Sequence, residues 1–171
     1  MIKIAITGPE STGKTTLSTA LAESYQTAWV PEYARSYIDQ LDRPYEQKDL
    51  LIIAKEQVRQ EEAAIRNANR LIFCDTDLTV IKIWSEHKYG SCDPEILKLL
   101  KQQHYDLYLL TGLDIPWEED DQREHPHLRE FFYAWYKKEL TALQVNLVEI
   151  QGDTIERMKL AKKAIDTILT A

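Results

Sequence analysis

A short glycine-bounded segment near the start of the chain constrains its fold more than any other feature. The segment matches the pattern G-x-x-x-x-G-K-[ST] at every fixed position and reads Gly8-Pro9-Glu10-Ser11-Thr12-Gly13-Lys14-Thr15. A β-branched apolar run, Ile2 to Thr7, precedes it, and a helical run, Lys14 to Ser24, follows it. In a strand–turn–helix unit of this kind, the backbone N–H groups of the glycine turn can wrap a polyphosphate. The N-terminus of the following helix is then directed at the anion.

The loop predicts a binding site for ATP and Mg²⁺. Lys14 is expected to reach the β- and γ-phosphates, and the Thr15 hydroxyl to ligate Mg²⁺. At average glycine usage, a chance match in a chain of 171 residues has odds of roughly one in a couple of hundred. The expected nucleotide-binding residues are Gly8, Pro9, Glu10, Ser11, Thr12, Gly13, Lys14, Thr15 and Thr16.

Predicted strands and helices alternate along the whole chain. The strands are continuous apolar runs, which indicates a parallel sheet covered by helices on both faces. We therefore expect one domain over residues 1–171, with a three-layer α/β fold of the P-loop NTPase and nucleoside-kinase type, a five-stranded parallel sheet and a lid loop. The expected strands are 2–7, 27–30, 70–75, 106–111 and 146–150, and the expected helices are 14–24, 33–41, 47–69, 78–89, 93–103, 127–143 and 154–169.

The composition is that of an ordinary globular domain and limits the partners of the chain. A formal net charge of −7 argues against a broad nucleic-acid-binding face, which needs clustered Lys and Arg. No apolar stretch approaches the length of a membrane span, and no signal-peptide pattern precedes the first strand. Cys74 and Cys92 have neither metal-ligand spacing nor a disulfide pattern, which favours reduced thiols and a cytoplasmic location. These features favour a small-molecule partner and leave the oligomeric state open.

Other classes of phosphate-loop protein fit the chain less well. A GTPase carries an N-K-x-D motif after a central strand, but the nearest strand end here reads Leu110-Thr111-Gly112-Leu113-Asp114. A D-x-x-G switch after the third strand is also missing, because the chain reads Asp75-Thr76-Asp77-Leu78 there. Motor and transporter ATPases need a longer chain. A small-molecule kinase is therefore the best fit to the length and layout.

Charged residues follow the second and third predicted strands. Ligands of doubly wound sheets bind outside the carboxyl ends of the strands. Glu32 is thus placed to accept a proton from an acceptor hydroxyl, and Arg35 to hold substrate or phosphate; an exposed Glu–Arg pair is the alternative. Asp75 has the position of a Walker-B acid, which holds Mg²⁺ directly or through water. Asp77 either contacts the substrate or caps the next helix.

A long acidic segment, approximately 113–129, follows the fourth predicted strand. Charged loops are commonly solvated surface, but a loop this long in a compact domain is often a lid. A lid arginine can neutralise the negative charge on a transferring phosphoryl group while closure excludes water. Arg123, which acids surround, is the first candidate for this role, and Arg129 is the second.

Further substrate contacts are expected from polar and aromatic side chains. Gln57 and Glu61 lie one helical turn apart and are either base-reading groups or ordinary exposed positions. Five large aromatic residues are mostly core candidates. Two of them flank Glu32, however, and one of these two rings could stack on an aromatic base. The five are Trp29, Tyr33, Trp84, Trp117 and Tyr136, of which Trp29 and Tyr33 are the flanking pair.

In these features the sequence resembles the ribosylnicotinamide kinase domain found at the C-terminal end of NadR-type proteins, within the AAA-like P-loop kinases. Four elements carry the resemblance and together span nearly the whole chain. The phosphate loop is common to many families, whereas the E-Y-x-R, D-T-D and I-P-W-x-x-D-x-x-R elements, in that order, are more specific. The four elements are the loop 8–15, Glu32-Tyr33-Ala34-Arg35, Phe73-Cys74-Asp75-Thr76-Asp77, and Asp114-Ile115-Pro116-Trp117 through Asp120 and Arg123.

The resemblance implies ATP and Mg²⁺ as cofactors and nicotinamide riboside as the acceptor, phosphorylated at its 5′-hydroxyl to nicotinamide mononucleotide. A more distant similarity to deoxynucleoside kinases implies Glu32 as the base, with Asp75 near Mg²⁺ or the acceptor. Two alternatives stay open. One is a kinase for another nucleoside or a nucleoside monophosphate, and the other is a regulator that binds ATP without transferring phosphate.

Overall fold

Five parallel strands form the centre of the molecule in the computed structural model, which describes residues 1–170. The strands are β1 (Ile2–Thr7), β2 (Ala28–Val30), β3 (Leu71–Asp75), β4 (Leu107–Thr111) and β5 (Leu147–Ile150). The helices are α1 (Lys14–Tyr25), α2 (Tyr33–Asp39), α3 (Gln47–Ile65), α4 (Leu78–Tyr89), α5 (Pro94–Gln102), α6 (Arg129–Ala142) and α7 (Thr154–Thr170). The strand order in the sheet is β2-β3-β1-β4-β5, so the first strand lies in the middle.

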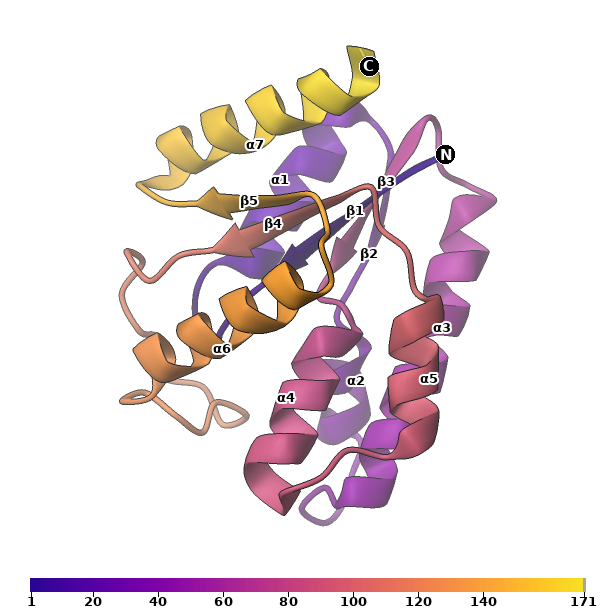
Figure 1. Ribbon diagram of the computed structural model, residues 1–171, viewed down its shortest axis with the longest axis vertical. Helices are drawn as coiled ribbons and strands as arrows, with labels where there is room; N and C mark the ends of the chain where they lie inside the picture. The colour runs from indigo at the N-terminus through magenta and orange to yellow at the C-terminus, as the bar shows by residue number, and fades with distance from the viewer. Residues whose placement is uncertain (171) are drawn as a thin grey trace.

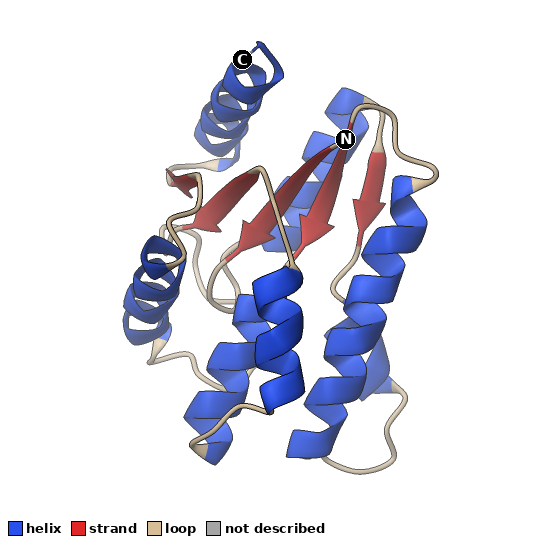
Figure 2. Ribbon diagram, turned by 45° about the vertical axis from the view of Figure 1, so that its right-hand side comes forward, coloured by secondary structure: helices blue, strands red, loops and turns tan. Residues whose placement is uncertain are grey.

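Helices cover both faces of the sheet, as Figures 1 and 2 show. Successive residues of a strand point to opposite faces. Ile4 and Ile6 of β1 therefore pack with α1 and α7, whereas Ala5 packs on the face covered by α4 and α6. Every residue of β3 and β4 is buried. Because both faces need apolar side chains, these strands are continuous apolar runs, which is the pattern seen in the sequence.

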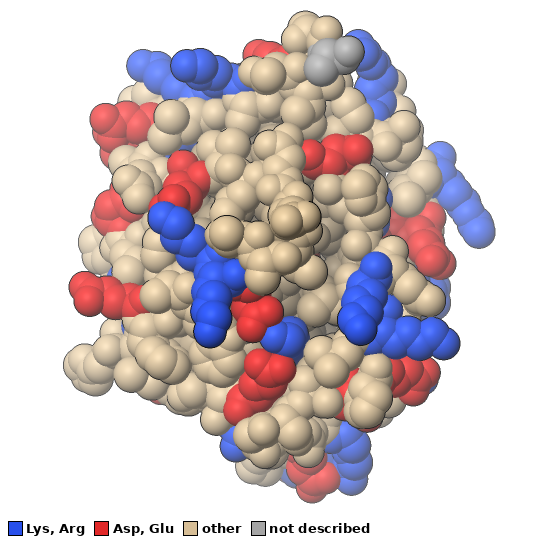
Figure 3. Space-filling model, viewed as in Figure 1, with Lys and Arg blue, Asp and Glu red and all other residues tan. Residues whose placement is uncertain are grey.

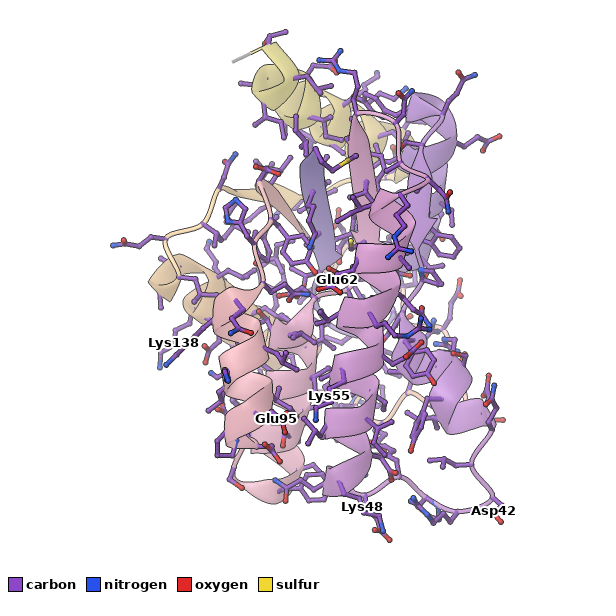
Figure 4. The ribbon with its side chains drawn as sticks, turned by 90° about the vertical axis from the view of Figure 1, so that its right-hand side faces the viewer. Asp42, Lys48, Lys55, Glu62, Glu95 and Lys138 are labelled. Carbon is purple, nitrogen blue, oxygen red and sulfur yellow. The ribbon has the colours of Figure 1, made fainter. Side chains whose placement is uncertain are left out.

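Helices α2 to α5 form a smaller cluster beside the sheet (Figure 1). Across this cluster, Lys55 Nζ of α3 lies 2.8 Å from a carboxylate oxygen of Glu95 on α5, and Figure 4 shows the two side chains pointing toward one another. Both side chains are about half exposed, so this ion pair contributes little to stability. The cluster is held by its buried apolar side chains, which are Ala34, Leu50, Ile53, Ala54, Leu78, Ile81 and Ile96.

The α/β fold with a five-stranded parallel sheet, expected from the sequence, is confirmed. Element ends fall within two residues of the expected ones, except at the end of α3. That helix ends at Ile65 and not at residue 69. The N–H groups of residues 66–68 bond to carbonyls three residues back, so the chain tightens into successive turns before β3.

The central position of β1 determines where a ligand can bind. β2 and β3 lie on one side of β1 in the sheet, and β4 and β5 lie on its other side. The direction in which strands are added therefore reverses at β1. In open α/β sheets, ligands bind at such a reversal, outside the carboxyl ends of the strands. The segments that leave these ends are the glycine turn after β1, Glu32 after β2, Asp75 at the end of β3 and Gly112 after β4.

Asp77 begins helix α4 directly after β3 and is fully buried. Its carboxylate accepts hydrogen bonds from the Thr79 N–H at 3.1 Å and from the Thr7 hydroxyl at 2.7 Å. Burial raises the pKa of Asp77 above its ordinary value, against the opposing effect of these bonds. The side chain therefore acts as a helix cap that also ties α4 to the end of β1.

We predict that Asp77→Ala lowers the free energy of unfolding by about 2–4 kcal/mol, because it leaves a buried hydroxyl and a helix N–H without an acceptor. Asp77→Asn is the matched control, since its amide oxygen can still accept and we expect it to lose less than half as much. Urea denaturation of the three proteins measures the effect. Equal midpoints for Asp77→Ala and the unmutated protein would contradict the capping role.

Candidate active site

A cleft of about 320 Å³ lies at the carboxyl edge of the sheet, within the size range of small-molecule pockets. It runs from the α7 side, over the phosphate loop, to the β2 side. Residues from both ends of the sequence therefore meet in it. The lining residues are Glu10, Ser11, Thr12, Gly13, Lys14, Thr15, Thr16, Leu17, Ala20, Glu32, Arg35, Trp84, Ile115, Glu118, Gln122, Arg123, Thr154, Arg157 and Met158.

The two glycines of the phosphate loop occupy positions that strongly favour glycine. A Cβ atom on Gly8 would lie 2.7 Å from the Thr111 hydroxyl oxygen, and one on Gly13 would lie 2.8 Å from Ile115 Cδ1. Both glycines have positive φ values, 140° and 78°. The pattern G-x-x-x-x-G thus reflects close packing of the loop against the end of β4 and the segment that follows it.

The side chains of the loop are already ordered by bonds within the protein. Lys14 Nζ donates to the Pro9 carbonyl at 2.9 Å, which holds the ammonium group over the loop. The Thr12 hydroxyl donates to the same carbonyl at 2.8 Å and lies 2.6 Å from the Thr111 hydroxyl. A nucleotide entering the cleft therefore meets a preformed loop and not one that must be ordered on binding.

Asp75 and Thr15 lie side by side beneath the loop. The Thr15 hydroxyl donates to Asp75 Oδ2 at 2.5 Å, whereas the buried Asp75 Oδ1 has no partner among the described residues. Burial, reinforced by the nearby Glu32 carboxylate, raises the pKa of Asp75 to about 6. An unpartnered carboxylate oxygen beside a hydroxyl is a donor set that suits Mg²⁺. The residues present therefore fit the metal that the sequence predicts.

A strained residue separates the roles of Asp75 and Asp77. Thr76 has a φ of 84°, a left-handed value that a β-branched residue rarely adopts. Its N–H continues the sheet by donating to the Ile6 carbonyl at 2.8 Å. The sharp turn at Thr76 lets the Asp75 carboxylate meet the phosphate loop while the Asp77 carboxylate enters the core.

Glu32 and Arg35 line the β2 end of the cleft. Glu32 occupies the N-cap position of α2, yet its carboxylate makes no capping bond, and it accepts no hydrogen bond within residues 1–170. Arg35 donates to Asp120 at 2.8 Å. Its carbonyl accepts a bond from the Gln122 side chain at 3.1 Å. Glu32 is thus available to a ligand, whereas Arg35 is tied to the loop 113–128.

The loop 113–128 rests on the phosphate loop through polar contacts. The Glu10 carboxylate accepts the N–H groups of residues 124 and 125 at 3.2 and 3.3 Å, and the Ser11 hydroxyl accepts the N–H of Glu118 at 2.9 Å. Burial raises the pKa of Glu10 above its ordinary value, although the two backbone hydrogen bonds act to lower it. Arg129 donates to the carbonyls of Ser11 and Ile115 at 3.0 and 2.7 Å. The segment that the sequence nominates as a lid therefore covers the loop in this structure.

The structure separates the two predicted lid arginines. Arg123 lines the cleft, and its guanidinium donates to the Glu118 carbonyl at 2.5 Å. Arg129 does not line the cleft; it joins the two loops, and its buried Nε has no partner within the described chain. The order of preference given by the sequence, with Arg123 first, is consistent with this placement and remains a prediction.

Four predicted substrate contacts do not line the cleft. Trp29 donates its indole N–H to the Ser18 hydroxyl at 2.9 Å and packs on the α1 side of the sheet. Tyr33 packs in the α2–α5 cluster, and its N–H donates to the Gln57 side-chain oxygen at 2.9 Å. Asp77 is the helix cap described above. Gln57 thus shapes the backbone next to Glu32 from behind the cleft.

Of the two alternatives given for Gln57 and Glu61, that of ordinary exposed positions is wrong. Each is only 2% exposed. Gln57 has one buried donor, Nε2, without a partner in the described residues. Glu61 accepts bonds from Lys3 at 3.0 Å and from the Tyr105 hydroxyl at 2.7 Å, so its buried carboxylate is paired with a partly exposed cation at the amino edge of the sheet. Helix α3 is covered on more than one side, which its apolar periodicity does not reveal.

Sequence reasoning missed several residues of the cleft. Trp84 was expected in the core, but it also lines the β2 end of the cleft. Thr154, Arg157 and Met158 of α7 line the opposite end. They stand four to eight residues after the last strand, within the first five residues of α7, and only that position relative to a carboxyl strand end could have identified them.

The surface of the described residues adds little to the site. On the face drawn in Figure 3, Lys and Arg are interspersed with Asp and Glu. Among residues 1–170, no three His, Cys, Asp or Glu side chains gather in a way that could hold a metal ion. No helix within the same residues is long and apolar enough to cross a membrane. The Mg²⁺ donors identified above are one carboxylate and one hydroxyl, which is a sparse protein set of the kind that magnesium uses with phosphates.

Comparison with known proteins relates nearly the whole chain to one family. Residues 3–157 match the family described as AAA domain. The Trifunctional NAD biosynthesis/regulator protein NadR of Escherichia coli (strain K12) is 28% identical over 170 residues, which cover 96% of this chain and 39% of that protein. The chain therefore spans about two fifths of the length of this relative. The resemblance to NadR-type proteins is confirmed.

Solved structures share the fold. A NadR protein in complex with NAD and AMP-PNP has a TM-score of 0.82 at 20% identity, over 97% of this chain and 49% of that chain. A NadR protein in complex with NR has a TM-score of 0.78 at 23% identity, over 97% and 51%. Deoxyadenosine kinase from M. mycoides has a TM-score of 0.65 at 14% identity, over 97% and 100%. The fold is thus that of P-loop nucleoside kinases.

We predict that Asp75→Asn stabilises the protein at neutral pH. The pKa of Asp75 is higher in the folded protein than its ordinary value of 3.8, so the folded state holds a proton more tightly than the unfolded state does. Stability therefore falls as the pH rises from about 4 to about 6, by roughly 3 kcal/mol for a pKa of about 6. Asparagine has no charge to bury, and it recovers about 1–3 kcal/mol above pH 7.

Urea denaturation of both proteins between pH 4 and pH 8 measures this effect. The gain in the free energy of unfolding should shrink below pH 6 and vanish near pH 4. Asp42→Asn, at an exposed carboxylate, is the control and should show no such pH dependence. A loss of stability in Asp75→Asn at pH 7.5 would contradict the prediction.

Proposed function

We propose that this chain, which belongs to the AAA domain family, is a kinase that transfers the γ-phosphoryl group of ATP to the 5′-hydroxyl of a nucleoside. One observation carries the proposal. A free carboxylate, Glu32, stands in the same cleft as an intact phosphate loop, at the end opposite α7. A site that only bound a nucleotide would have no need of an unengaged base in that place.

The two ends of the cleft support two different ligands. Because β5 and β2 are the opposite edges of the sheet, α7 and Glu32 flank the phosphate loop from opposite sides. Lys14 and Thr15 on the central loop suit the polyphosphate of ATP. The β2 end, with Glu32, Trp84 and Gln122, has the mixture of polar and aromatic groups that suits a nucleoside.

The chain's own groups suffice for in-line transfer by positioning and charge stabilisation. Glu32 orients the acceptor hydroxyl and takes its proton as the oxygen attacks the γ-phosphorus. The bond from the γ-phosphorus to the β,γ-bridging oxygen breaks in the same step, and ADP leaves. Lys14, released from the Pro9 carbonyl, holds the β- and γ-phosphates, and Arg123 neutralises the transferring group. Thr15 and Asp75 would hold Mg²⁺, which supplies further neutralisation of phosphate charge when bound.

The charges at the β2 end favour an acceptor without a phosphate. Glu10 and Glu32 line this part of the cleft, with Asp75 beside them, and Arg35 is already paired with Asp120. A nucleoside monophosphate would bring its own negative charge against these carboxylates. A neutral or cationic nucleoside fits better, and nicotinamide riboside carries a pyridinium cation. The NadR structure in complex with NR supports this choice of first acceptor.

Two other readings of the site make different predictions. A kinase for another nucleoside, or for a monophosphate, would use the same groups with a different acceptor. A regulator that binds ATP without transfer would bind nucleotide but release no ADP in response to any acceptor. The free Glu32 carboxylate favours transfer over the second reading.

The decisive experiment measures ADP release with ATP and Mg²⁺ against nicotinamide riboside, common nucleosides and their monophosphates. We expect turnover with nicotinamide riboside and none with monophosphates. Glu32→Gln should lower kcat by about 10²- to 10⁴-fold with little change in ATP affinity. Glu62→Gln, at an exposed position of α3, is the matched control and should keep its activity.

The outcomes separate the alternatives. If nicotinamide riboside is inert while another nucleoside turns over, the acceptor is wrong and the kinase stands. If no member of the panel causes ADP release although ATP binds, the protein is a nucleotide-binding regulator and the proposal fails.

We further predict that Trp84 supplies an aromatic surface for the acceptor base. Its ring lines the β2 end of the cleft and also packs against the core. Stacking of a base on an aromatic ring is worth about 1–3 kcal/mol, so Trp84→Leu should raise the acceptor KM by about tenfold and leave the ATP KM within about twofold. Trp84→Phe keeps an aromatic ring and should lose less. Equal acceptor KM values for the leucine and phenylalanine variants would contradict stacking.

A further inference from the structure

Arg157, one turn into α7, is a buried arginine to which the proposed transfer assigns no role. Its side chain is 3% exposed. Nε donates to the Gly152 carbonyl at 2.9 Å, Nη1 donates to the Thr12 carbonyl at 2.6 Å, and Nη2 donates to the Gly112 carbonyl at 3.0 Å. One guanidinium thus joins the phosphate loop, the segment after β4 and the segment after β5.

A single carboxylate balances the buried charge. Asp114 accepts a bond from Arg157 Nη2 at 3.0 Å and another from the Gly152 N–H. Burial opposes ionisation of Asp114, but these bonds outweigh it, and the pKa lies below its ordinary value. Four of the five guanidinium donor positions are therefore accounted for, and the group cannot turn without breaking several bonds at once.

The bond to Thr12 fixes the orientation of a peptide plane in the phosphate loop. The peptide between Thr12 and Gly13 is planar and trans, so its carbonyl and its N–H point in opposite directions. Holding the Thr12 carbonyl on Arg157 therefore directs the Gly13 N–H away from the guanidinium. Gly13 lines the cleft, and backbone N–H groups of this loop are what bind phosphate oxygens.

We propose that Arg157 is a positioning residue that keeps the phosphate loop in its phosphate-binding shape. It acts from the α7 end of the cleft, which it also lines, by setting the Thr12–Gly13 peptide plane against the ends of β4 and β5. Arginine is needed because three carbonyls converge on one planar group with fixed donor directions, and a lysine ammonium cannot meet all three at these distances. The kinetic part of this proposal rests on the proposed kinase activity, whereas the structural part does not.

The test compares Arg157→Lys with Arg43→Lys. Arg43 also binds a carboxylate, with bonds of 2.7 and 2.9 Å to Asp49, and it lies outside the cleft. The two variants therefore make the same chemical change at an arginine–aspartate ion pair, with the Arg43 side chain 36% exposed and the Arg157 side chain 3% exposed. Hydrogen exchange of the amides of residues 10–13 in the nucleotide-free proteins reports the order of the loop. Calorimetric titration with ADP reports nucleotide affinity.

We expect Arg157→Lys to speed exchange of the loop amides and to weaken ADP binding by about 10- to 100-fold, since small displacements of positioning groups have effects of this size. With an active acceptor, the ATP KM should rise while the acceptor KM stays within about twofold. Arg43→Lys should change none of these quantities. A general loss of stability would lower the amount of active protein and would not single out the ATP KM.

Two results would overturn the proposal. The first is unchanged exchange of the loop amides in Arg157→Lys, and the second is unchanged ADP affinity despite a loosened loop. If the unmutated protein binds no nucleotide, the proposed kinase fails, and the exchange experiment alone then decides whether Arg157 orders the loop. If Arg157→Lys does not fold, Asp114→Asn removes the counter-charge while keeping an acceptor oxygen, and it should loosen the same amides.

Discussion

The close packing of the phosphate loop against the end of β4 is the constraint on which the candidate site depends. Gly8 leaves no room for a side chain because its Cβ would lie only 2.7 Å from the Thr111 hydroxyl oxygen. The same hydroxyl lies 2.6 Å from the Thr12 hydroxyl. Arg157 then adds its bonds to the carbonyls of Thr12 and Gly112. The loop is therefore held by its neighbours on the sheet, and not only by the strand and helix that flank it in sequence.

Two unfavourable features accompany this order, and both lie at the end of β3. Asp75 is buried with one oxygen unpartnered, and Thr76 has a left-handed backbone conformation. Each lowers the stability of the free protein. Their common effect is to present a carboxylate to Thr15 and to the space beside the phosphate loop. Such local costs are typical of functional sites, where stability is exchanged for preorganised chemistry.

Much of the fold could be predicted from the sequence because its parallel strands are continuous apolar runs and its helices alternate with them. The phosphate loop could be predicted because its geometry requires fixed residue types at fixed spacing. The strand order could not be predicted, since apolar runs do not specify which strands are neighbours. Trp29 illustrates the consequence. Its position opposite Phe73 in the β2–β3 register places it on the α1 face, although it stands only three residues before Glu32.

Residues that depend on long-range contacts left no local pattern. Glu61 resembles an exposed helix residue, but its partners include Lys3 and Tyr105, which come from distant parts of the chain. Arg157 resembles an ordinary charged residue near a helix start, yet the carbonyls that bind it follow the ends of different strands. A single sequence specifies such sites through tertiary structure alone, and a spacing rule cannot detect them.

The two ends of the cleft are held in different ways, and this difference bears on how the ligands enter. At the α7 end, the phosphate loop is fixed by the bonds of the buried Arg157 guanidinium to backbone carbonyls, and these bonds are present without a ligand. At the β2 end, the loop 113–128 is joined through Glu10, Ser11 and the ion pair of Arg35 with Asp120, which are exposed or partly exposed contacts. Arg129 adds part-buried bonds to the carbonyls of Ser11 and Ile115. Exposed polar contacts are weak and exchange readily with water. Opening of the part of the loop that contacts Glu10 and Arg35 therefore costs less than displacement of the parts held by Arg129 and Arg157, so under the proposed function the fold favours a rigid nucleotide site beside an accessible acceptor site.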